Sequence, residues 1–169
     1  MSEKGEAGTS KSISEWWRSY LGNREQDPEA RALAARLRHA TGVEALVEPA
    51  VHKLARSLEL GQRDGDADRV IRLATVLAEV REHDQHRLAA RLGAANAMSR
   101  LRFERLIRSG TDEIATAVRR GLPLVERRCN VAMLGVDLLF WNDSVRARWC
   151  FDYYGATPPQ SLSSEENDA

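Results

Sequence analysis

The sequence predicts an all-α protein of about six to nine helices joined by short loops, with no sheet. Two observations lead to this prediction. Apolar residues recur at helical spacing in successive segments, for example at Ala30, Leu33 and Leu37. The β-branched residues are scattered and never alternate with polar residues over a useful length, so no segment has the pattern of a strand.

The N-terminal segment divides into a polar stretch and a short aromatic helix. Residues 1–12 consist mainly of Gly, Ser, Lys and Glu, and we expect them to be disordered. A helix follows from about Ser14 to Gly22 and bears Trp16 and Trp17. Aromatic residues are usually buried, so we expect this helix to dock on the core, with a contact to a partner protein as the alternative.

Start and stop signals place the next helices. Asp27 is a suitable N-cap and Pro28 suits the first helical position, so a helix begins there and ends at Thr41-Gly42. Pro49 begins another helix. The acidic loop 61–68 is the best candidate by composition for a connection between two parts of the protein. Two further helices are expected, at roughly 67–83 and 86–93.

The C-terminal part begins with an arginine-rich segment and ends in an acidic tail. Residues 130–141 are apolar all round except for Asp137, which indicates a buried central helix. An arginine from the preceding segment is the expected partner of this carboxylate, because an unpaired buried charge is costly. The last helix covers 144–154, with Trp149 on its apolar face, and the tail 157–169 is expected to be disordered.

The formal net charge of zero conceals one basic block, Met98–Arg128, which holds eight arginines and four acids. Residues 129–169 are acidic in compensation, with two basic and six acidic groups. Every cation in the block is Arg, whose planar guanidinium group can donate two parallel N–H hydrogen bonds to a phosphate. A solvated charged surface is the common explanation of such a run, but the composition also favours a polyanionic partner.

Within this block, the helix after Gly110 has two distinct sides. At about 100° per residue, Ile114, Val118, Leu122 and Val125 fall on one arc. Arg119, Arg120 and Arg127 fall on the opposite side and are expected to face solvent or a ligand. Pro123 is expected to kink or break the helix. The preceding half, 98–108, shows no clean separation of faces.

No catalytic residue, metal site or cofactor is predicted. The chain lacks a CxxC pair, HExxH, a phosphate-binding glycine loop and GxSxG. His83-Asp84 is a dipeptide that metal-dependent phosphohydrolases of the HD type use, which leaves such an enzyme as an alternative function. The strongly polar surroundings of this dipeptide favour a solvated turn instead.

The remaining features suit a cytoplasmic protein with no membrane or small-molecule partner. No apolar run approaches the roughly 18–20 residues needed to span a bilayer, and the first residues lack an apolar signal region. Cys129 and Cys150 lie beside apolar helical residues, so we expect reduced core thiols and no disulfide.

A resemblance to a known family gives a more specific hypothesis. The SRLRFERLIRS stretch, the Arg-bearing helix after it and NVAMLGVDLLFWNDSVRARWCFDYY resemble the C-terminal half of the CasB family. These proteins are the small subunits of the type I-E CRISPR Cascade surveillance complex. Residues 98–154 have the matching pattern, which includes Trp141, Arg146 and Tyr153.

The resemblance implies a two-lobed helical bundle without enzymatic activity. It assigns 13–93 to an N-terminal lobe and 94–156 to a C-terminal lobe with a basic face. The implied partners are target DNA, including the displaced strand and the heteroduplex, the crRNA-bound backbone and large subunits, and a second copy of the chain.

The DNA is expected to be held by its phosphates without base reading, which stabilises the R-loop. A helical scaffold that binds only other proteins remains an alternative. The candidate DNA-binding residues, in order of preference, are Arg119, Arg120, Arg127, Arg102, Arg105, Arg108, Arg100, Arg128 and Arg146.

Overall fold

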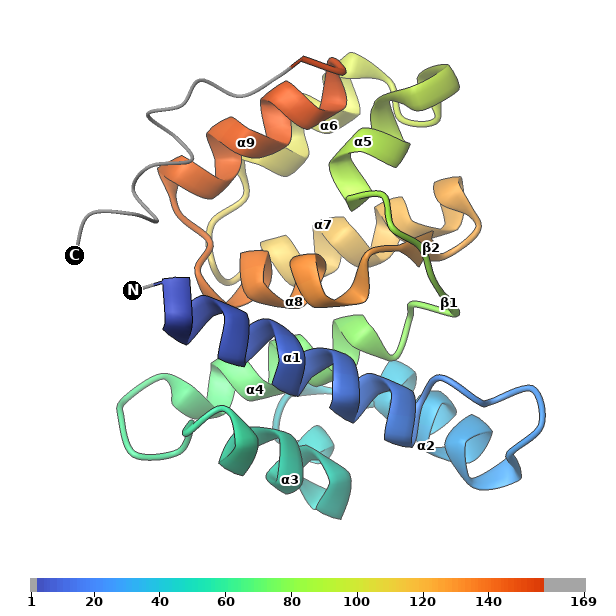
Figure 1. The fold of residues 1–169 in the computed structure, drawn as a ribbon, viewed down its shortest axis with the longest axis vertical. Coiled ribbons are helices and arrows are strands. Elements are labelled where there is room, and N and C mark those ends of the chain that lie inside the picture. Colours follow the sequence, from blue (N-terminus) through green and yellow to red (C-terminus); the bar gives the residue numbers. More distant parts are fainter. Residues whose placement is uncertain (1–2, 157–169) are drawn as a thin grey trace.

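The structure is a computed structural model that describes residues 3–156. The predicted disorder of the tail 157–169 lies outside the described residues. Within this range the α-helices are α1 (Glu3–Tyr20), α2 (Pro28–His39), α3 (Pro49–Ser57), α4 (Asp66–Leu77), α5 (Leu88–Gly93), α6 (Arg100–Arg108), α7 (Ile114–Gly121), α8 (Val131–Leu139) and α9 (Asp143–Tyr153). Short 3-10 helices are η1 (Gly42–Val47), η2 (Ala94–Asn96) and η3 (Leu122–Val125). The all-α prediction is therefore confirmed in its main point (Figure 1).

The N-terminal helix is longer than expected. The prediction that residues 1–12 are disordered is wrong for residues 3–12, because α1 already begins at Glu3. Ile13 is completely buried, and α1 runs alongside the apolar helix α8 (Figure 1). A polar segment can remain helical when the helix that continues it is fixed by such packing. Trp16 and Trp17 are buried, which confirms that this helix docks on the core.

The predicted caps of the next helices are confirmed. The carboxylate of Asp27 accepts a hydrogen bond from the backbone N–H of Glu29 at 2.9 Å, and Pro28 is the first residue of α2. Pro49 begins α3 in the same way. Helix α4 ends at Leu77, before the predicted limit near residue 83, because the chain then enters an extended segment.

A small sheet corrects the prediction of no sheet. Strands β1 (Glu82–His83) and β2 (Arg128–Cys129) pair in parallel, with Glu82 opposite Arg128. Two residues are too few to produce a detectable alternation of apolar and polar side chains. The pairing arises because the folded chain brings together two segments that lie far apart in the sequence (Figure 1).

Close approaches fix the C-terminal helices. Helix α5 packs against α9 (Figure 1), and a Cβ atom added at Gly93 would lie 1.8 Å from the carbonyl oxygen of Tyr153. Helix α7 ends at Gly121, two residues before Pro123, and the chain continues as η3. This confirms the predicted break.

One hydrophobic cluster runs through the described residues from α1 to α9. It contains Ile114, Val118, Leu122 and Val125, which confirms the predicted apolar arc. Because α5 packs on α9 and α1 on α8, helices from both sides of residue 93 share this core, and the two-lobed arrangement is not confirmed. Cys129 and Cys150 are free thiols, as expected. No helix among residues 3–156 is long and apolar enough to cross a membrane.

Candidate nucleic-acid interface

Helix α6 presents arginines to solvent on a well-anchored support. Phe103 and Leu106 are buried, and the ring of Phe103 stacks on Tyr153 with 4.0 Å between centroids. The side chain of Ser99 caps the helix by accepting from the N–H of Arg102 at 3.4 Å. The helix is therefore amphipathic, although the sequence pattern of 98–108 did not separate its two faces.

Three arginines occupy the exposed side of α6. Arg102, Arg105 and Arg108 are exposed, and within residues 3–156 none of their guanidinium groups has an ion pair or a hydrogen bond. Arg100 differs because it forms an ion pair with Glu104 at 3.0 Å. About 100° of rotation per residue places Arg105 and Arg108 opposite Phe103 and Leu106, so both point away from the core.

Arg119 and Arg127 are only partly exposed, with 30% and 23% of their side-chain surface accessible, so the prediction that they face solvent freely needs correction. Both guanidinium groups contact the carboxylate of Glu79, which follows α4 and is only 9% exposed. Arg119 lies 3.0 Å from Glu79 and also donates to the carbonyl oxygen of Arg38. Arg127 lies beyond η3 in a left-handed turn with φ of 57°, so a helical wheel drawn through α7 misplaces it.

The other predicted arginines fall into two groups. Arg120 is exposed and has no partner among the described residues. Arg128 forms an ion pair with Glu82 at 3.2 Å. Arg146 donates to the carbonyl oxygen of Ser109 at 3.0 Å and pairs with Asp143 at 3.0 Å. Arg128 and Arg146 are thus engaged within the chain.

The buried carboxylate of Asp137 has partners on α9, which corrects the expectation of an arginine from the basic block. Its two oxygens accept from Trp149 Nε1 at 2.7 Å and from Arg148 at 3.3 Å. Burial nevertheless raises the pKa of Asp137 to about 6, against the opposing effects of Trp149 and Arg148. This pair fastens α9 to the centre of the fold.

His83-Asp84 is less solvated than predicted, because Asp84 is only 12% exposed. Asp84 accepts from the backbone N–H of His86 at 2.8 Å and pairs with Arg91 at 3.2 Å. The backbone hydrogen bond from His86, aided by its ring, lowers the pKa of Asp84 to about 2. Among residues 3–156, no group of three or more His, Cys, Asp or Glu side chains could hold a metal ion.

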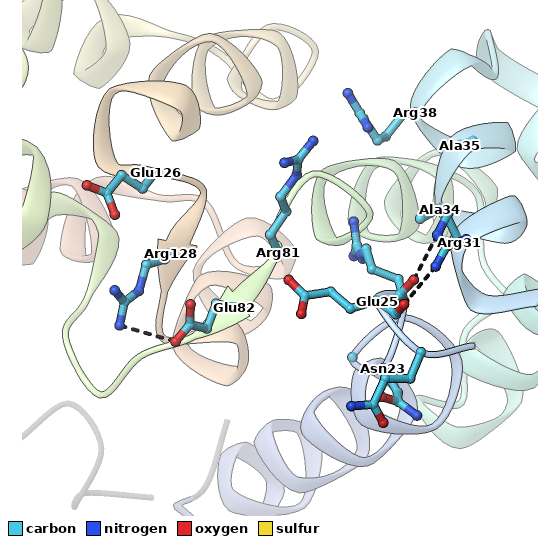
Figure 2. A pocket seen from close by; sticks show the side chains of 13 residues that line it. Asn23, Glu25, Arg31, Ala34, Ala35, Arg38, Arg81, Glu82, Glu126 and Arg128 are labelled. Atoms are coloured by element: carbon cyan, nitrogen blue, oxygen red, sulfur yellow. Dashed lines mark hydrogen bonds and ion pairs between the residues drawn. The ribbon is translucent and has the colours of Figure 1, made fainter. Parts of the chain in front are cut away.

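Sequence reasoning missed a groove of about 890 Å³ near the start of β1 (Figure 2). Its charged lining residues are Arg24, Arg31, Arg38, Arg81, Arg128, Glu25, Glu82 and Glu126. All but Glu126 and Arg128 lie outside the basic block, in regions whose local charge is balanced. Counting charge along the chain cannot detect such a site, because the fold alone gathers these arginines.

Comparison with known proteins identifies the family. The family model described as CRISPR-associated protein Cse2 matches residues 7–154. The chain belongs to the Cse2 family. This confirms the resemblance drawn from residues 98–154, since Cse2 and CasB denote the same family. It also extends that resemblance to α1–α5.

A curated Cse2 protein gives a more local match. CRISPR-associated protein Cse2 of Thermus thermophilus is 37% identical over 71 residues, which is 40% of this chain and 42% of the relative. The match therefore spans less than half of the length of that Cse2 protein. No solved structure matches this chain.

Proposed function

We propose that this Cse2-family chain is a non-catalytic subunit of a Cascade complex that binds target DNA, including the displaced strand, and stabilises the R-loop. Family membership supports the assignment to Cascade. The observation that most supports DNA binding is the exposed arginine face of α6, where Arg102, Arg105 and Arg108 have no partner within the described residues. Arg120 is a further candidate contact.

The chemistry of this face suits phosphates. A guanidinium group binds two phosphate oxygens in a bidentate geometry, and contacts to phosphate do not distinguish one base sequence from another. The aromatic residue of α6, Phe103, is stacked inward on Tyr153 and is not available as a platform for bases. The proposed binding is therefore independent of sequence and sensitive to salt.

The proposed partners follow from the family. They are the crRNA-bound backbone subunits, the large subunit and a second copy of this chain within the complex. A rigid α6, held by Phe103 and Leu106, would present its arginines at a fixed orientation in such an assembly.

The test is a charge reversal on α6 with a matched control. R105E/R108E replaces two exposed arginines on α6, and R56E/R63E makes the same change in charge on α3 and in the loop after it. We expect the first variant to bind mixed-sequence single-stranded DNA at least tenfold more weakly than the second. The slope of log affinity against log salt should fall by about 1.4 for two lost contacts.

The opposite result would contradict the proposal. If R105E/R108E bound DNA as tightly as R56E/R63E and with the same salt slope, α6 would not be the binding face. If the wild-type chain failed to bind DNA at low salt, the helical scaffold without nucleic acid would be the better assignment.

A further inference from the structure

Five arginines cluster around one buried carboxylate near the end of α4. Glu79 is the common partner of Arg38, Arg119 and Arg127, and the Arg38 Nε atom lies 3.3 Å from its Oε2. Arg24 and Arg81 lie close to this group. The cluster and the groove beside it together hold seven arginines and four glutamates, so an excess of positive charge remains in this region.

Arg24 shows how this excess of charge acts. Its guanidinium donates to the carbonyl oxygens of Ala78 and Val80 at 2.8 Å each, which holds it in place without a carboxylate. Burial, followed by the repulsion of Arg38 and Arg81, lowers the pKa of Arg24 to about 10. It remains charged at neutral pH, in a position where an additional anion would be favourable.

The cluster opens into the groove of about 890 Å³ (Figure 2). Figure 2 shows Arg81 extending from the start of β1 toward Arg38 on α2. Arg81 is exposed and has no ion pair within residues 3–156. The side chain of Arg38 is partly exposed, and its Nε atom faces the carboxylate of Glu79 at 3.3 Å. The groove thus presents guanidinium groups on opposite walls, of which that of Arg81 has no partner within the described residues.

The lining indicates the class of ligand. Its uncharged residues are Gly22, Asn23, Gln26, Ala34 and Ala35, so no large apolar or aromatic side chain is present. A protein partner usually inserts such anchors into a groove, whereas a sugar–phosphate backbone needs only cations and small neighbours. An acidic peptide is therefore the less favoured occupant.

We propose that this groove is a second phosphate-binding site, which takes the backbone of a nucleic-acid strand between Arg38 and Arg81. The inference rests on the proposed function, because it assigns another contact to the same polyanionic partner. Helices α2 and α6 lie toward opposite ends of the long axis (Figure 1), so the groove and the α6 face are separate contacts. A strand that engages both would run along the molecule.

The experiment measures binding of the full chain to a mixed-sequence single-stranded DNA oligonucleotide as a function of salt. Arg81→Glu is the test variant, because Arg81 is exposed and its replacement leaves the Glu79 contacts intact. Arg63→Glu is the matched control, an exposed arginine in the loop between α3 and α4. We expect R81E to weaken binding about tenfold relative to R63E and to lower the salt slope by about 0.7. Arg81→Lys, which retains the charge, should recover most of the affinity.

Other outcomes separate this inference from the proposed function. If R105E/R108E weakens DNA binding while R81E matches R63E, the groove site is wrong and the proposed function stands. If the wild-type chain binds no DNA, the proposed function itself fails. If R81E abolishes binding of poly-glutamate while leaving DNA binding unchanged, the groove takes an acidic protein segment and the phosphate site is overturned.

Discussion

The carboxylate of Glu79 lies 3.0 Å from the guanidinium of Arg119, and this ion pair joins α4 to α7. Arg38 on α2 and Arg127 beyond η3 reach the same carboxylate. Glu79 is therefore the point where three distant segments of the chain are tied together. Its position explains why Arg119 and Arg127, which the sequence predicts as DNA contacts, are partly buried and paired within the chain.

Replacing Glu79 by Gln should destabilise the fold. The variant leaves three partly buried guanidinium groups without their carboxylate, and loss of one partner of a buried ion pair costs about 3 to 5 kcal/mol. We expect the free energy of unfolding in urea to fall by about 3 kcal/mol. Glu113→Gln at an exposed position is the control and should change it by less than about 0.5 kcal/mol. Equal free energies of unfolding for the two variants would show that the negative charge of Glu79 does not stabilise the fold.

Replacement of Arg119 should lower the stability of the fold, whereas replacement of Arg105 should weaken DNA binding. Arg119→Gln removes a contact to Glu79, so we expect a loss of roughly 1 to 3 kcal/mol in stability with an unchanged salt slope for DNA binding. Arg105→Gln removes an exposed cation, so stability should stay within about 0.5 kcal/mol while the salt slope falls. Urea unfolding and DNA titrations on both variants measure this. The reverse pattern would restore the outward orientation predicted for Arg119.

Gly93→Ala should disrupt the contact between α5 and α9. The new methyl group would lie 1.8 Å from the carbonyl oxygen of Tyr153, and a backbone atom cannot move aside as a side chain can. Overpacking of this kind costs about 1 to 3 kcal/mol and sometimes more, so we expect a clear drop in melting temperature. Gly110→Ala, with no atom within 4 Å of the added carbon, is the control. A melting temperature equal to that of the control would mean that the two helices can separate freely.

The stability of the protein should depend on pH through Asp137. Its pKa is raised from 3.8 to about 6 in the fold, so the folded state binds more protons than the unfolded state between these values. Stability contributed by protonation is therefore present below about pH 4 and is lost as the pH rises to 6, by roughly 2 to 3 kcal/mol.

Asp137→Asn isolates this contribution. Arg87, Arg148 and Asp152 also surround the carboxylate, and all three remain in the variant. The free energy of unfolding of the wild type, measured from pH 4 to 7, should decline as Asp137 loses its proton. The Asp137→Asn variant should lack this part of the decline. Parallel pH profiles for the two proteins would mean that Asp137 keeps an ordinary pKa.

The sequence determined the helical class, most helix starts and the family. Local signals suffice for these features, because a cap such as Asp27 acts within one turn and an apolar arc such as that of α7 recurs within the helix itself. The family pattern of residues 98–154 is likewise a property of the linear chain. The exposed arginines of α6 were among the predicted contacts because they lie in the basic block, which is visible in the linear sequence.

Only the tertiary structure decided which arginines are free. Glu79 is 40 residues from Arg119 along the chain, and no local pattern indicates that the two meet. The partner of Asp137 came from α9 and not from the basic block, because packing and not proximity in sequence selects the partner of a buried charge. The groove between Arg38 and Arg81 has the same origin, since all of its arginines except Arg128 come from segments that are neutral in net charge and meet only in the fold.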